Sequence, residues 1–241
     1  MRVLLLGGTA EARALAETLH PQVDVISSLA GRVPDPALPV GPVRIGGFGG
    51  VEGLRRWLQD EHIDAVVDAT HPFAATMTAH AAQVCGQLQI PHVVLARPAW
   101  HPGAAAIVAS DTEAAETVAQ KCYSRVFLTT GRSGVNAFAD SDAWFLIRAV
   151  TAPDAALLPR RHRLLLSRGP YRYDDERALL RTHRIDALVT KNSGGDMTRA
   201  KLDAAAAQGI PVVMVARPQL PTGVTVVDTV QEAAGWVAGL D

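Results

Sequence analysis

Short apolar runs alternate along the chain with segments in which apolar residues recur every three or four positions. The runs have the length and composition of buried strands, and they are expected at residues 3–6, 23–27, 65–68, 92–96, 126–129, 144–148, 164–167, 187–190 and 212–216. The periodic segments predict helices at 10–19, 51–61, 74–88, 175–181 and 198–208. This alternation predicts an α/β fold with mostly parallel sheets covered by helices on both faces.

The sequence also contains an internal repeat. The matched segments are 63–67 with 185–189, 90–98 with 210–218, and 113–119 with 232–238. Generic similarity between α/β segments is the alternative, but three matches in one order favour two related Rossmann-like halves with a cleft between them. We expect residues 1–103 to form the N-terminal half and residues 104–241 the C-terminal half. The segment 107–122 could pack on either.

Composition narrows the class of protein. Hydrophobic residues make up 48% of the chain and charged residues 20%, which argues against disorder, and the net charge of -1 gives no basic field for nucleic acid. Cys85 and Cys122 are expected to be buried free thiols in helices, and no Cys/His spacing predicts a metal site. Because no apolar run is long enough for a secretion signal or a membrane span, we expect a cytoplasmic protein with no membrane partner.

The most informative local motif is a glycine turn at the N-terminus. A strand leads into Gly7 and Gly8, and a helix follows, which is the arrangement that brings a backbone close to a pyrophosphate at a helix N-terminus. The motif departs from the G-x-G-x-x-G pattern, because Ala10 and Arg13 stand at the later glycine positions, so a plain strand-to-helix turn is the alternative. The cofactor contacts expected from this turn are Gly7, Gly8, Thr9, Ala10 and Glu11.

The end of the second strand indicates which dinucleotide binds. An NAD site commonly carries an acidic residue there, whereas this chain has Ser27, Ser28 and then Arg32. Asp24 lies too early in the strand to reach the ribose. Hydroxyl groups and an arginine suit a 2′-phosphate, so we expect NADPH as the cofactor; a solvated loop position is the alternative for Arg32.

Three later loops are further candidates. Glycines surround Phe48 in the segment 46–50, where the backbone can approach a flat ligand. After the strand 65–68, Thr70 and His71 precede Pro72, where a helix is expected to begin with Thr70 or His71 as its cap. Thr70, His71 and Pro72 are also expected to contact the cofactor. The repeat places Lys191, Asn192 and Ser193 in the equivalent loop, so the two loops could face one cleft. A third loop, 129–134, also follows a strand.

Taken together, these motifs are similar to those of the precorrin-6A reductase family of cobalamin biosynthesis, which includes cobalt-precorrin-6A reductases. The resemblance covers nearly the whole chain and rests on LGGTAEAR (6–13), GGFGG (46–50), DATHPFA (68–74), RPAW (97–100), LTTGR (128–132) and TKNSGG (190–195). It implies NADPH-dependent reduction of one C=C bond in a contracted-ring tetrapyrrole, precorrin-6A, to give precorrin-6B. It also implies an N-terminal NADP-binding domain, a C-terminal domain that completes the substrate cleft, and no metal or flavin. Hand-over contacts with neighbouring pathway enzymes are a further expectation.

Roles for the charged residues follow from this reaction. After hydride transfer a proton must be supplied, by His71, by Lys191 or by solvent. The substrate carries carboxylates that need cationic partners, and the expected substrate contacts are Arg44, Gly47, Phe48, Arg97, Arg132, Lys191, Asn192, Ser193 and Arg217. For Arg97 and Arg217 the alternative is that each holds its own loop through a backbone carbonyl. The rival functions are the cobalt-containing version of the step, another NADP-linked dehydrogenase, and a nucleotide sensor without catalysis.

Overall fold

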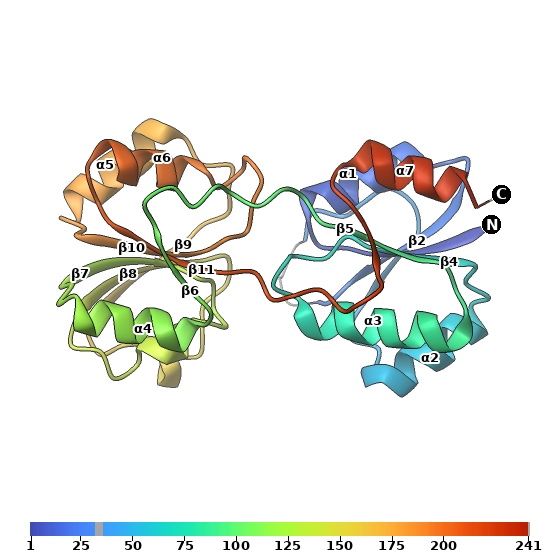
Figure 1. Ribbon diagram of the computed structural model, residues 1–241, viewed down its shortest axis with the longest axis horizontal. Helices are drawn as coiled ribbons and strands as arrows, with labels where there is room; N and C mark the ends of the chain where they lie inside the picture. Colours follow the sequence, from blue (N-terminus) through green and yellow to red (C-terminus); the bar gives the residue numbers. More distant parts are fainter. Residues whose placement is uncertain (32–35, 241) are drawn as a thin grey trace. The chain divides into compact units, whose positions relative to one another are not determined.

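The computed structural model describes residues 1–31 and 36–240, and it divides into two compact units. The first unit contains Met1–Pro98 and the chain from Pro218 onward, and the second contains Ala99–Arg217 (Figure 1). Each unit is built on a six-stranded sheet in which every strand pairing is parallel. No helix in these described residues is long and apolar enough to cross a membrane.

The sheet of the first unit has the strand order β12-β5-β4-β1-β2-β3. Its strands are β1 (Arg2–Leu6), β2 (Asp24–Leu29), β3 (Val43–Ile45), β4 (Ala65–Asp68), β5 (His92–Leu95) and β12 (Thr225–Val227). Its helices are α1 (Ala10–Leu19), α2 (Gly50–Asp60), α3 (Ala75–Leu88) and α7 (Val230–Ala238). Helices α1 and α7 cover one face and α2 and α3 the other, because the central strands are apolar on both sides (Figure 1).

The second unit repeats this plan with the order β6-β11-β10-β7-β8-β9. Its strands are β6 (Ala106–Val108), β7 (Arg125–Thr129), β8 (Trp144–Ala149), β9 (His162–Leu166), β10 (Ala187–Lys191) and β11 (Val212–Val215). Its helices are α4 (Asp111–Gln120), α5 (Tyr173–Thr182), α6 (Ala200–Ala207) and the short 3₁₀ helices η1 (Val135–Phe138) and η2 (Ala155–Leu157). Helices α5 and α6 cover one face, and α4 lies on the other (Figure 1).

The two sequence repeats exchange their last strand and helix. Strand β6 follows β5 in the chain but pairs with β11, whereas β12 follows β11 but pairs with β5. The helices that follow go with them, so α7 packs on α1 and α4 packs on β11. The structure therefore corrects the expected division at 103/104, since residues from Pro218 onward fold with the N-terminal unit, and it places the segment 107–122 in the second unit.

Equivalent residues in the two units make equivalent hydrogen bonds. Asp64 accepts a hydrogen bond from the backbone N–H of Arg2 at 2.6 Å, and Asp186 accepts one from that of Arg125 at 3.0 Å. In each unit the carboxylate ties the start of the first central strand to the start of its neighbour. The prediction of two related Rossmann-like halves is thus confirmed at the level of single contacts.

Several local expectations were wrong. Strands β3, β6 and β12 were missed, because each is only three residues long and leaves no periodic pattern. Helix α3 begins at Ala75 rather than near Pro72, and its N-cap Ala74 makes no side-chain capping bond, so neither Thr70 nor His71 caps it. Cys85 is buried in α3, but Cys122 is exposed and lies beyond the end of α4.

Candidate functional site

The glycine turn sits between the carboxyl ends of β1 and β2. The N–H of Gly7 donates to the carbonyl of Ser28 at 2.9 Å, and Gly8 has a φ of +110°, a conformation that other residues rarely adopt. A Cβ on Gly7 would lie 3.3 Å from the Cβ of Ala12, whereas one on Gly8 would meet nothing within 4 Å. A small hollow beside the turn is lined by Gly7, Gly8, Ala12, Arg13, Ser27, Leu29, Ala37 and Pro39.

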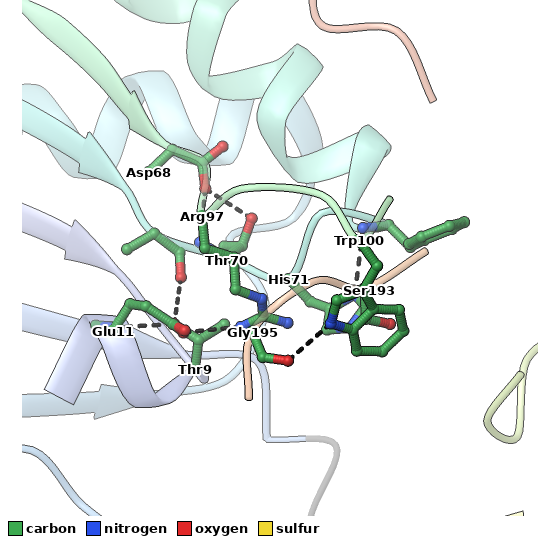
Figure 2. Close-up of polar contacts among 12 residues, drawn as sticks. Thr9, Glu11, Asp68, Thr70, His71, Arg97, Trp100, Ser193 and Gly195 are labelled. Carbon is green, nitrogen blue, oxygen red and sulfur yellow. Dashed lines mark hydrogen bonds and ion pairs between the residues drawn. The ribbon is translucent and has the colours of Figure 1, made fainter. Parts of the chain in front are cut away.

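Thr9 joins the turn to the neighbouring loop. It is the N-cap of α1, where its Oγ1 accepts a hydrogen bond from the N–H of Ala12 at 3.0 Å. The same hydroxyl donates to the carbonyl of Ala69 at 2.8 Å, just beyond β4 (Figure 2). The side chain is only 8% exposed, so it positions the turn and the loop after β4 relative to each other.

Glu11 and Arg97, which the sequence assigned to cofactor and substrate respectively, form an ion pair with each other. Arg97 Nη1 lies 2.7 Å from Glu11 Oε2, and the two side chains are 16% and 26% exposed (Figure 2). Glu11 lies in the first turn of α1, where a free carboxylate would oppose a bound pyrophosphate. The arginine offsets that charge, so the N-terminus of α1 can still attract an anion.

The loop after β4 is organised by a residue that sequence reasoning missed. Asp68 is 1% exposed, and its Oδ1 accepts hydrogen bonds from both the N–H and the Oγ1 of Thr70, at 3.0 and 2.6 Å (Figure 2). His71 is exposed, and its Nδ1 accepts from the N–H of Phe73 at 3.2 Å, so in the neutral ring the proton sits on Nε2. The sequence contained one signal for this turn: Asp68 is the last residue of a strand and stands two positions before Thr70, a spacing at which an aspartate can hydrogen-bond to the backbone.

Asp68 also acts on two titratable groups in the core between the sheet and α3. Burial raises the pKa of the Cys85 thiol to about 12, and the negative charge of Asp68 adds to the increase. Burial lowers the pKa of His92, while Asp68 opposes that shift. In both groups burial favours the uncharged form of the side chain.

The carboxyl end of β2 holds two of the three residues expected at the ribose. Ser27 is 1% exposed and its side chain is buried, whereas Ser28 Oγ accepts a hydrogen bond from Arg44 Nη1 at 2.9 Å. Arg44 belongs to β3, and its guanidinium lies 3.8 Å from the centre of the Phe48 ring. Arg32 lies outside the described residues. Arg44, expected at the substrate, is thus a neighbour of a residue expected at the cofactor.

In the second unit, the loop after β10 is held by a tryptophan. The backbone N–H of Trp100 donates to Asn192 Oδ1 at 2.8 Å, and Asn192 Nδ2 donates back to the Trp100 carbonyl at 3.1 Å. The indole N–H of Trp100 donates to the Gly195 carbonyl at 2.8 Å (Figure 2). Lys191 Nζ pairs with Asp111 Oδ2, the first residue of α4, at 3.2 Å.

The remaining predicted cations have different surroundings. Arg217 donates from Nε to the Asn192 carbonyl at 2.9 Å and from Nη2 to the Ser193 carbonyl at 3.2 Å, so it holds the loop after β10, as the structural alternative proposed. Arg132 is exposed, and its Nη1 makes a long hydrogen bond of 3.5 Å to Thr151 Oγ1. Arg97 and Arg217 have equivalent sequence positions, but Arg97 pairs with the carboxylate of Glu11 whereas Arg217 binds two backbone carbonyls.

A buried charged cluster in the second unit was also missed by sequence reasoning. Arg148, in β8, makes two hydrogen bonds to Glu176 of α5, at 2.9 and 2.6 Å, and both side chains are almost fully buried. Its guanidinium lies 3.9 Å from the centre of the Tyr171 ring. Burial lowers the pKa of the adjacent Lys201 to about 7; Arg148 lowers it further and Glu176 raises it. In strand register Arg148 occupies the position that Ser28 has in the first unit.

Comparison with known proteins gives one consistent result. The precorrin-6A reductase of Mycobacterium tuberculosis (strain CDC 1551 / Oshkosh) is 76% identical over 239 residues, covering 99% of this chain and 98% of that protein. The cobalt-precorrin-6A reductase of Priestia megaterium is 28% identical over 247 residues, covering 95% of each. A solved structure of CobK precorrin-6A reductase aligns with a TM-score of 0.91 at 36% identity, covering 100% of this chain and 97% of that one. A model of the family precorrin-6x reductase CbiJ/CobK matches residues 2–238, and the chain belongs to this family.

Proposed function

We propose that the protein reduces one C=C bond of the precorrin-6A macrocycle with NADPH, by hydride transfer, to give precorrin-6B. Membership of the family makes it a reductase of cobalamin biosynthesis. The observation that carries the proposal for the cofactor is the open glycine turn between β1 and β2, beside the N-terminus of α1. The roles of the two units, the first for the cofactor and the second for the substrate, stay predictions.

The residues of the turn fit a dinucleotide. The N–H groups of Ala10 and Glu11 come before the first intrahelical hydrogen bond of α1, which runs from the N–H of Arg13 to the Thr9 carbonyl. They are therefore available to a pyrophosphate above Gly8, and the Glu11–Arg97 pair removes the charge that would repel it. When bound, a reduced nicotinamide supplies the hydride.

Two side chains could supply the proton. His71 could act as the acid in its imidazolium form, which gives one proton to the macrocycle and is left as the neutral ring; in that neutral ring Nδ1 can accept the bond from Phe73. Lys191 is an ammonium group that already holds the carboxylate of Asp111, and the same chemistry suits it to holding a substrate carboxylate. We therefore favour His71 as the acid and Lys191 as a binding residue; both assignments stay proposals.

The cobalt-free substrate is the better supported of the two forms. The relative named for precorrin-6A is 76% identical to this chain, and the one named for cobalt-precorrin-6A is 28% identical. Mixing the enzyme with NADPH and either precorrin-6A or its cobalt complex, and following absorbance of the macrocycle, separates these two functions. Absence of turnover with both, despite tight NADPH binding, would favour the nucleotide sensor. A place in the cytoplasm and hand-over contacts with pathway enzymes stay predictions.

Gly8→Ala tests the cofactor site directly. The added methyl group enters the space proposed for the pyrophosphate, so NADPH affinity should fall at least tenfold in a folded protein. Gly223→Ala is the matched control, because Gly223 also has a positive φ, +81°, and an added Cβ there meets nothing within 4 Å. Titration of NADPH fluorescence gives both affinities. Equal affinities in the two variants would mean that the turn is only structural.

A further inference from the structure

Arg44 lies where a Rossmann-type unit recognises the ribose of its dinucleotide. Strand β3 pairs with β2 so that Arg44 stands opposite Ser28, and β2 in turn pairs with β1, which leads into the glycine turn. The residue at the end of the second strand of such a unit contacts the ribose 2′ position. Ser28 is the last residue but one of β2, and the hydrogen bond from Arg44 to Ser28 Oγ puts the guanidinium next to it.

The guanidinium is held in a fixed plane. Its Nη1 donates to Ser28 Oγ at 2.9 Å and to the Gly46 carbonyl at 3.0 Å, and its Nη2 donates to the Gly47 carbonyl at 3.1 Å. The Phe48 ring covers one face, 3.8 Å from the guanidinium carbon. A guanidinium carries five N–H groups, so these contacts leave two of them for a ligand. The glycine-rich segment thus orients an arginine without using all of its donors.

The charge of Arg44 has no carboxylate partner in the described part of the chain. Arg2, Arg55 and Arg97, in the same unit, each form an ion pair with an acidic side chain. The three oxygens that Arg44 contacts belong to a hydroxyl group and to two backbone carbonyls. Partial burial lowers its pKa, as expected for a cation whose lost hydration no anion replaces. A bound anion would supply the missing partner.

We propose that Arg44, together with Ser28, binds the 2′-phosphate of the dinucleotide and sets the preference for NADPH over NADH. This rests on the proposed function and replaces the sequence-based expectation that Arg44 binds substrate carboxylates. A phosphate at this position accepts paired hydrogen bonds from a guanidinium held flat by Phe48. NADH lacks the phosphate, so its affinity depends little on Arg44.

A purely structural role predicts a different pattern. If Arg44 only fixes the segment 46–50, its loss disturbs binding of both dinucleotides and of any fragment that contacts this segment. If Arg44 binds the 2′-phosphate, the loss is confined to ligands that carry this group. The probes that separate the two roles are therefore pairs differing only in the 2′-phosphate: NADPH with NADH, and 2′,5′-ADP with 5′-AMP.

The experiment is calorimetric titration of wild type, Arg44→Ala and Arg44→Lys with these four ligands. Arg56→Ala, an exposed arginine on α2, controls for the loss of one positive charge from the same unit. We expect Arg44→Ala to weaken NADPH and 2′,5′-ADP by about ten- to a hundredfold, the range of one charge-assisted hydrogen bond, with NADH and 5′-AMP changed less than about threefold. Arg44→Lys should recover part of the loss, and Arg56→Ala should behave as wild type.

Two results would overturn the inference. Unchanged NADPH affinity in Arg44→Ala removes the residue from the cofactor site, and equal losses for NADPH and NADH reduce it to a structural role. Because these are binding measurements without precorrin-6A, they are independent of turnover. A wild-type protein that binds neither dinucleotide refutes the proposed function and this inference together. If the wild type binds NADPH and Arg44→Ala binds it equally well, only the inference is refuted.

Discussion

Arg148 and Glu176 form a buried ion pair in the second unit, and substituting one of them should destabilise the protein more than substituting the other. Glu176→Gln keeps the size of the side chain and removes its charge. It leaves Arg148 as an uncompensated buried cation, 7% exposed and next to Lys201. Arg148→Met leaves Glu176 buried instead, but Lys201 can then gain a proton, because Arg148 lowers the pKa of Lys201 and Glu176 raises it. The glutamate variant should therefore be the more damaging.

The magnitudes follow from the burial. Removing one partner of a buried pair costs about 3–5 kcal/mol, and we expect Glu176→Gln in that range because both of its hydrogen bonds are to a charged group. Arg148→Met should cost roughly 1–3 kcal/mol less, since Lys201 takes over as counter-ion. The double variant Arg148→Met/Glu176→Leu removes both charges, so it should be less destabilised than Glu176→Gln alone.

Urea unfolding followed by circular dichroism measures these free energies. The control is Asp203→Asn, which breaks the exposed pair of Arg199 and Asp203 in the same unit and should cost less than about 0.5 kcal/mol. In a Lys201→Met background the difference between Glu176→Gln and Arg148→Met should shrink, because no second cation remains. If Glu176→Gln and Arg148→Met lower the free energy of unfolding equally while Lys201 is present, Lys201 does not replace Arg148 as the partner of Glu176.

Three further predictions follow from single contacts. The pKa of Lys201 is about 7 in the folded protein and 10.5 in the unfolded chain, so between these pH values the unfolded state binds more protons and the free energy of unfolding should rise with pH. Lys201→Met should flatten this rise. An unchanged slope of the free energy against pH, measured by urea unfolding at several pH values, would contradict the prediction. Thr9→Val should cost about 1–3 kcal/mol in the same assay, because it removes the N-cap of α1 and the bond to the Ala69 carbonyl, whereas Thr9→Ser should retain most of the stability. Lys191→Ala should raise the KM for precorrin-6A or lower kcat, leave NADPH affinity nearly unchanged and weaken the salt dependence of substrate binding; wild-type kinetics at two ionic strengths would remove Lys191 from the substrate site.

The sequence by itself determined the class of fold and the places where chemistry is expected. Strand and helix periodicity, glycine turns and the matched segments are local signals, and they led to two related parallel α/β halves with candidate residues in the loops after β1, β4 and β10. The fold prediction is confirmed, because every parallel sheet needs apolar strands and crossover helices and both leave a local pattern in the sequence; the candidate residues stay predictions. The same locality explains why the expected N-cap at Thr70 or His71 was wrong, since Asp68 holds Thr70 in a turn instead.

Only the tertiary structure decided which distant segments meet. The exchange of β6 and β12 leaves no trace in either repeat, because a three-residue edge strand has the same pattern whichever sheet it completes. The pairing of Glu11 with Arg97 joins residues 86 positions apart. Nothing in the linear pattern distinguishes Arg97, which binds this carboxylate, from Arg217, which binds the Asn192 carbonyl. Arg44 likewise lies beside Ser28 because β2 and β3 are neighbours in the sheet. Charge partners are chosen by spatial proximity and burial, neither of which a linear pattern encodes.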